Sequence, residues 1–442
     1  MTNRGDNPVQ MQSSSPSQTG AYARYRLLSS LGGKLADAVG VVIAIKTLSP
    51  QDYGVIGAAL GLMAVIGFIN LMPEDILWRD LPKLRHRLAE HLSAYVWFWL
   101  VKFGAVAAVA AGFCLIYAHT RQSWTVAVFV FTIAMLLQLL SSSTLAEVPL
   151  FAGLRQQRGA AFVLGVRVMW LALLLPNFWL HSLRYYVVAL AVYASVTAMI
   201  SFWLLQHQLG VTRRCPPAQA WRLVRETALD FTVWWHLVGR ARVFLLRGDL
   251  AILGGIGMSL AALGQYTVAI SLVGFALVLP GVLENVAAVS FAHHPERRTH
   301  NLRRFLAAAT GLAGVQFLGG LLCGRIALRL LHVADVENTF IIFLILLGGV
   351  SIFVLACPTL AYAICFRRMR EVFGWVFLPA AVVFATAIWI AGKQWGVTGA
   401  AIAHAAVMAA AGIGTMVYVL LDRDATGTVE LSAAEAESSF QE

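Results

Sequence analysis

Residues 339–363 read TFIIFLILLGGVSIFVLACPTLAYA, a run of uncharged and mostly apolar side chains. About 20 such residues in a helix cross a hydrocarbon core of about 30 Å. The sequence contains twelve apolar stretches of comparable length, separated by short polar segments. None alternates with a period of two, so we predict transmembrane helices and not a barrel. The stretches are residues 27–48, 54–78, 92–118, 124–150, 159–180, 184–206, 228–256, 264–291, 305–332, 339–363, 372–392 and 396–421.

The composition agrees with a membrane protein. Of 442 residues, 59% are hydrophobic and only 12% are charged, whereas soluble proteins carry roughly 25% charged residues. This composition excludes a soluble enzyme, a disordered protein and a secreted disulfide scaffold. The five cysteines are scattered without a CxxC pair, so neither a disulfide framework nor a zinc site is predicted. We expect no cofactor, no metal and no catalytic residue.

The net charge is +11, and its distribution favours membrane topology over a nucleic-acid partner. If the N-terminus is cytoplasmic, the outer loops contain only Arg121, Arg184 and Lys393. The inner loops contain Arg79, Lys83, Arg85, Arg87, Arg155, Arg158, Arg213, Arg214, Arg222, Arg225, Arg297, Arg298, Arg303, Arg304, Arg367, Arg368 and Arg370. This bias follows the positive-inside rule and predicts that both termini are cytoplasmic.

The longest inner loop divides the chain into two sets of six spans. We predict a disordered tail over 1–26, an N-terminal lobe over 27–206, a linker over 207–227, a C-terminal lobe over 228–421 and an acidic tail over 422–442. The linker contains Pro216-Pro217, and 218–226 is predicted to be a short interfacial helix. A candidate internal sequence repeat supports duplicated halves. Lys34 lies nineteen residues before Tyr53, and Arg247 lies nineteen residues before Tyr266.

Ionisable residues inside the spans are the candidate functional residues, because charge is unfavourable in lipid. We expect substrate binding at Lys34, Asp37, Arg167, Arg240, Arg242, Arg247 and Asp249. Coupling or gating carboxylates are expected at Glu74, Asp75, Asp230 and Glu284. In the seventh span, Arg240 aligns with Arg247 and Arg242 with Asp249, on stripes about 200° apart. Either the helix breaks at Gly239 or Gly248, or one stripe pairs with a neighbouring helix.

Two interpretations of these charges stay open. They could form an internal salt-bridge network that only orients helices. Alternatively they line a hydrated cationic cavity, in which Arg and Lys suit phosphate oxygens. The carboxylates would then carry a coupling proton or neutralise the empty site.

Several segments resemble one family. TLSPQDYG at 47–54 resembles the "LGPxDYG" turn of Wzx-like polysaccharide flippases, the polysaccharide-transporter branch of the multidrug/oligosaccharidyl-lipid/polysaccharide (MOP) superfamily. RGDLAILG at 247–254, with LGQY at 263–266, resembles that family's seventh helix and next turn. GVTGAAIA at 396–403 resembles its last helix. Leu250 stands where many relatives have Arg, and Pro73-Glu74-Asp75 replaces the common "DLGL".

The resemblance implies an all-helical protein of two six-helix lobes around a V-shaped cavity in the bacterial inner membrane. It implies a flippase for an undecaprenyl-diphosphate-linked oligosaccharide, in contact with membrane lipid and serving a polysaccharide polymerase or export machinery. It also implies essential charges at Lys34, Asp37, Arg247 and Asp249. The main alternative is an ion-coupled multidrug or small-solute antiporter of the same superfamily, which a net positive site disfavours. A membrane-embedded transferase is a third class, for which His293, His294 and His300 are the only candidate groups, in an Arg-rich loop.

Overall fold

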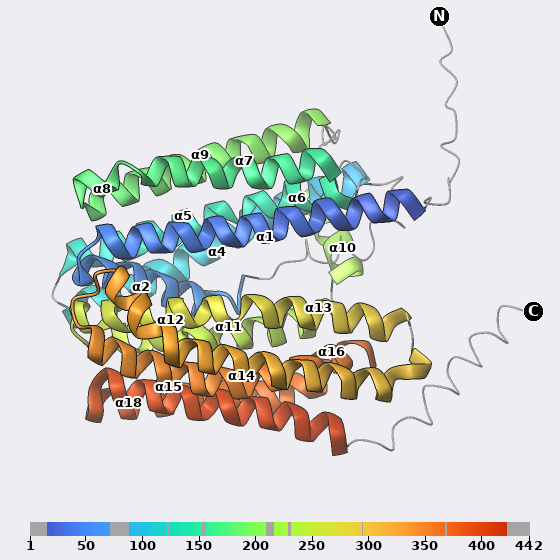
Figure 1. Ribbon diagram of the computed structural model, residues 1–442. Helices are drawn as coiled ribbons and strands as arrows, with labels where there is room; N and C mark the ends of the chain where they lie inside the picture. The colour runs from blue at the N-terminus through green and yellow to red at the C-terminus, as the bar shows by residue number, and fades with distance from the viewer. Residues whose placement is uncertain are drawn as a thin grey trace, which may run out of the picture.

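The computed structural model describes residues 16–70, 88–121, 123–152, 156–208, 216–228, 231–293, 295–366 and 369–421. Within these residues every element of regular structure is helical, as predicted. The long helices lie side by side (Figure 1). The α-helices are α1 (Pro16–Thr47), α2 (Pro50–Ile66), α4 (Leu88–Arg121), α5 (Trp124–Leu140), α6 (Ser142–Ala152), α7 (Gln156–Leu174), α8 (Asn177–Leu180), α9 (Leu183–Gln208), α10 (Pro217–Ala228), α11 (Phe231–Gly255), α12 (Leu260–Ala276), α13 (Val278–His293), α14 (Arg298–Leu330), α15 (Val336–Leu355), α16 (Cys357–Phe366), α17 (Met369–Val372) and α18 (Leu378–Leu421).

Eight segments of the described chain are long and apolar enough to cross a membrane, so this is a multi-span membrane protein. One of them, Met369–Leu421, contains two of the predicted spans. These two are separated at Gly396, the first residue of the last predicted span, whose φ of 65° and ψ of −150° break the helix just after the predicted loop. The remaining predicted spans fall on α1, on the shorter apolar helix α2 and on α11, which carries four charged side chains.

Several helix starts differ from the prediction, and three of them have a visible reason or consequence. α1 begins at Pro16, so the polar tail expected over 1–26 is partly helical. α2 begins at Pro50 instead of residue 54, because Ser49 caps it by accepting a hydrogen bond from the Asp52 N–H. α12 begins at Leu260 instead of residue 264, because Ser259 caps it in the same way. The linker helix predicted over 218–226 is present as α10.

Prolines account for breaks inside two predicted spans. Pro280 has no N–H to donate to the Ala276 carbonyl, and the chain is divided there into α12 and α13. The side chain of Gln316 donates to that carbonyl instead, at 2.5 Å. Pro358 likewise follows the break between α15 and α16. The break at Pro280 therefore does not leave the Ala276 carbonyl oxygen unsatisfied.

Helix α2 joins the N-terminal helices (α1–α9) to the C-terminal helices (α11–α18). It packs mainly on α11 and α12, and also on α5. α2 and α12 each have 17 residues and cross where Gly54 meets Gly264. Such a reciprocal contact is what two related halves would form. Tyr53 lies one residue before Gly54, whereas Tyr266 lies two residues after Gly264, so the two tyrosines do not occupy matching positions in this contact.

Candidate functional site

A cavity of about 370 Å³ lies between the N-terminal and the C-terminal helices. Helices α1, α2, α5, α7 and α9 line it from one side, and α11 and α12 from the other. Its volume is at the lower end of the range typical of small-molecule sites. Its charged and hydroxyl-bearing lining residues are Asp37, Tyr53, Arg167, Tyr186, Tyr193, Arg247 and Ser271. Three of the charges predicted from the sequence therefore meet in one place.

Two of these three charges form an ion pair. Arg167 Nη1 lies 2.9 Å from Asp37 Oδ1, which links α7 to α1. The same Arg167 nitrogen donates a hydrogen bond to the Tyr193 hydroxyl of α9 at 3.1 Å. Both charged side chains stay partly accessible, so the pair neutralises itself while facing the cavity.

Arg247 supplies the third charge, from α11. Its side chain is partly buried and reaches the cavity. Within the described part of the chain it forms no hydrogen bond or ion pair, although Tyr53 and Asp249 lie within electrostatic reach. A guanidinium has five N–H donors, and burying them without acceptors is unfavourable. The cavity thus carries one net positive charge with free donors, which suits an anion.

Aromatic side chains form much of the remaining wall. Trp170 stacks on Tyr193, with ring centroids 5.0 Å apart, and meets Tyr186 edge to face at 5.7 Å. Tyr53 of α2 lies 3.3 Å, oxygen to oxygen, from Ser271 of α12, a hydrogen bond between the two groups of helices. Rings with hydroxyl groups next to an arginine are suited to a ligand that combines sugar and phosphate groups.

The other residues predicted for this site lie elsewhere. Arg242 forms a bidentate ion pair with Glu284 of α13, with nitrogen–oxygen distances of 2.8 and 2.7 Å. α11 continues through Gly239 and Gly248, so the predicted helix break is wrong and the pairing alternative holds for Arg242. Lys34 and Arg240 are partly buried and do not line the cavity. Glu74, Asp75 and Asp230 lie outside the described residues.

Asp249 also lies away from the cavity lining. It is completely buried among the C-terminal helices, where Tyr266 and His404 surround its carboxylate. His404 was not predicted, since a single histidine in an apolar helix resembles an ordinary core residue. The available signal was its position directly after the segment 396–403 that carries the family resemblance.

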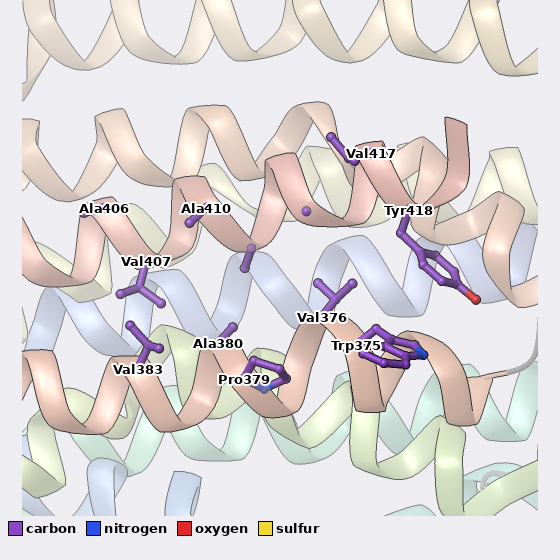
Figure 2. A pocket seen from close by; sticks show the side chains of 12 residues that line it. Trp375, Val376, Pro379, Ala380, Val383, Ala406, Val407, Ala410, Val417 and Tyr418 are labelled. Carbon is purple, nitrogen blue, oxygen red and sulfur yellow. The ribbon is translucent and has the colours of Figure 1, made fainter. Parts of the chain in front are cut away.

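A groove of about 820 Å³ lies between the two halves of the segment 369–421. Figure 2 shows Trp375, Pro379 and Val383 on one helical segment facing Val407 and Val417 on the other. Its lining has no charged side chain, and Trp375 and Val383 are largely exposed. This groove fits hydrocarbon chains and does not offer a site for a charged headgroup.

The fold is that of transporters of the MOP superfamily. The chain is similar to an inward-facing multidrug resistance MATE family transporter of that superfamily, with a TM-score of 0.61 and 13% identity over 89% of this chain and 94% of that one. It is also similar to the lipid II flippase MurJ in an inward closed conformation, with a TM-score of 0.66 and 10% identity over 90% and 87%. A third neighbour is the MATE transporter VcmN of Vibrio cholerae, with a TM-score of 0.54 and 12% identity over 92% and 98%. No protein-family model and no curated protein matches the sequence.

Proposed function

We propose that the chain is a flippase that moves an undecaprenyl-diphosphate-linked oligosaccharide across the bacterial inner membrane for polysaccharide biosynthesis. The observation that carries this proposal is Arg247, a guanidinium that meets no acceptor among the described residues and faces a cavity shared by both groups of helices. A diphosphate offers the oxygens that this side chain lacks. The aromatic wall formed by Trp170, Tyr186 and Tyr193 would face the sugar next to the diphosphate.

The apolar membrane around the cavity fits a lipid-linked substrate. In this mechanism the headgroup enters the cavity while the polyprenyl chain remains in the hydrocarbon core of the membrane. We expect twelve spans with both termini in the cytoplasm, and two lobes on either side of the cavity that would open alternately to the two sides of the membrane. One of the structural neighbours is named as a flippase of lipid II. No catalytic group is needed for this movement.

The alternative is an ion-coupled multidrug or small-solute antiporter. Two structural neighbours are named as MATE transporters, and the aromatic wall would also accept flat organic cations. The charge of the cavity argues against that substrate, because Asp37 is already paired with Arg167 and Arg247 adds a positive charge. An organic cation would therefore be repelled.

Binding and transport by the purified full chain test this proposal. Farnesyl diphosphate serves as a soluble probe of the anion site, with farnesol and an organic cation for comparison. Of these three compounds, we expect only farnesyl diphosphate to bind. Arg247→Gln should weaken its binding at least tenfold. The matched control is Arg329→Gln, an exposed arginine at the end of α14.

In proteoliposomes, Arg247→Gln is expected to abolish movement of a polyprenyl-diphosphate-linked sugar, while Arg329→Gln leaves it intact. Unchanged diphosphate binding in Arg247→Gln would overturn the anion site. Transport of an organic cation, without movement of the sugar lipid, would instead establish the antiporter.

A further inference from the structure

A second polar cluster lies inside the C-terminal helices. Asp249, Tyr266 and His404 are all at most 1% exposed. Asp249 Oδ1 accepts a hydrogen bond from the Leu250 backbone N–H at 2.8 Å. Asp249 Oδ2 accepts one from the Tyr266 hydroxyl at 2.5 Å and lies 2.6 Å from His404 Nδ1. Helices α11, α12 and α18 therefore meet at one carboxylate.

The charge of this cluster depends on one proton. Among the described residues, no Lys or Arg side chain is paired with Asp249. An ionised carboxylate beside a neutral imidazole would leave a fully buried negative charge with no cation bound directly to it among the described residues, which is unfavourable. One added proton makes the pair neutral overall.

The geometry shows where this proton can bind. When Asp249 is ionised, its oxygen 2.6 Å from His404 Nδ1 accepts a hydrogen bond from an Nδ1–H, and the neutral ring then has its lone pair on Nε2. Nε2 is buried and has no hydrogen-bond partner in the described structure. An added proton has two positions in this geometry: Nε2, with Nδ1–H still donating to Asp249, or the Asp249 carboxyl, with Nδ1 accepting from it. Either position makes the pair neutral.

We propose that Asp249 and His404 form a proton-binding site, and that a proton bound there strengthens the binding of an anion at Arg247. The first half of this inference stands alone. The second half rests on the proposed function, because it needs Arg247 to be the anion site.

The surroundings of the pair leave Arg247 as its charged neighbour within the described residues. On α18 the Phe384 ring lies edge to face with the His404 ring, with centroids 5.3 Å apart. The titratable groups near the pair are Arg247 on α11, Tyr266 on α12 and Tyr117 of α4, which packs against Gly254. The other helices that pack here do so through glycines: Gly61 of α2 lies against Leu250 and Ala251, and Gly349 of α15 lies against Ala405. Apart from Arg247 and the tyrosines, these residues have no titratable side chain.

Arg247 and Asp249 connect the two sites through one helix. They are two residues apart on α11 and so point in directions about 200° apart. Without the added proton, the negative charge of the pair offsets Arg247. With it, the pair is neutral and the positive charge of Arg247 is available to an anion. Linkage is reciprocal, so anion binding must draw a proton onto the pair.

Infrared difference spectra between acidic and alkaline pH test the proton site without any substrate. The spectra are recorded on the full chain in sodium-free buffer, so that sodium binding cannot contribute. We expect the wild type to show a carboxyl band and an imidazole band that titrate together, and both Asp249→Asn and His404→Gln to lose the pair of bands. His236→Gln is the matched control, because His236 is also buried but contacts the Gly67 carbonyl.

If His404→Gln does not fold, Tyr266→Phe replaces it, because the loss of one donor to Asp249 should shift the carboxyl band. Spectra that are identical in the wild type and in whichever of these variants folds would overturn the proton site.

Calorimetry of farnesyl diphosphate binding, in two buffers of different ionisation enthalpy, tests the linkage. For each farnesyl diphosphate bound, the wild type should take up more protons than His404→Gln, by at most about one. The wild type should also bind farnesyl diphosphate roughly 5- to 10-fold more tightly than this variant. Equal proton uptake would overturn the linkage. If Arg247→Gln loses probe binding but keeps its infrared bands, the anion binds at Arg247 and the proton binds at a different site, as proposed. Unchanged probe binding in Arg247→Gln would refute the anion site and leave the proton site standing.

Discussion

Gly54 and Gly264 lie against each other's helix at the crossing of α2 and α12. A Cβ atom on Gly54 would lie 2.1 Å from the Leu260 carbonyl oxygen, and one on Gly264 would lie 1.8 Å from the Pro50 carbonyl oxygen. Neither oxygen can yield without a shift of its helix. This reciprocal contact brings the beginnings of two helices from opposite groups together next to the cavity.

We therefore expect Gly54→Ala and Gly264→Ala each to destabilise the protein by about 1–3 kcal/mol, because the added methyl group overpacks the crossing. The melting temperature of the purified protein in detergent measures this effect. Gly311→Ala is the control, since a Cβ there meets open space and alanine favours a helix. A melting temperature that falls no further in the two crossing variants than in the control would contradict the contact.

The second prediction concerns the paired charges of the cavity. Asp37→Asn should release Arg167 and strengthen binding of farnesyl diphosphate roughly tenfold, because the cavity gains one net positive charge. Arg167→Gln should weaken it by a similar factor, because Asp37 then offsets Arg247. Binding at fixed ionic strength measures both changes. Equal affinities in the two variants would show that the anion is bound elsewhere.

The third prediction separates structural from functional arginines on α11. Arg242 and Glu284 are largely withdrawn from solvent, so removing either partner alone should destabilise the protein by about 3 kcal/mol. The double variant Arg242→Met/Glu284→Leu should recover most of that stability and bind farnesyl diphosphate like the wild type. Thermal unfolding and binding are measured on the same preparations. A double variant that is stable but unable to bind would place Arg242 in the anion site.

The sequence predicted the helices well, because long apolar runs between polar loops leave few alternatives. Asp37, Arg167 and Arg247 could be singled out because each charge lies inside an apolar run. The pairing of Arg167 with Asp37 could not be predicted, since it depends on how α7 packs against α1. The same holds for Asp249, whose surroundings come from α12 and α18.

His404 shows the limit of a charge-based search most clearly. A neutral imidazole costs little in an apolar helix, and nothing in the local sequence indicates a buried carboxylate 155 positions earlier in the chain. The helix starts at Pro50 and Leu260 were misplaced for a different reason. The hydrophobic pattern marks the apolar part of a helix, whereas the capping serine defines where the helix begins.

The fourth prediction tests whether the α2–α12 contact opens during transport. A Cβ on Gly57 would lie 3.0 Å from the Thr267 Cβ, close enough for a disulfide after a small adjustment. Oxidation of the variant Gly57→Cys/Thr267→Cys should therefore fix α2 to α12. If the two groups of helices separate during the cycle, sugar-lipid movement in proteoliposomes should stop on oxidation and recover on reduction.

Binding of farnesyl diphosphate should survive this crosslink, because the cavity is present in the state that the disulfide retains. The single variants Gly57→Cys and Thr267→Cys control for the substitutions and for the native cysteines, which oxidation also reaches. Transport that continues at the full rate in the crosslinked protein would mean that α2 and α12 move as one body. The lobes would then have to part along another surface, and the anion site at Arg247 would need a different route to the second side of the membrane.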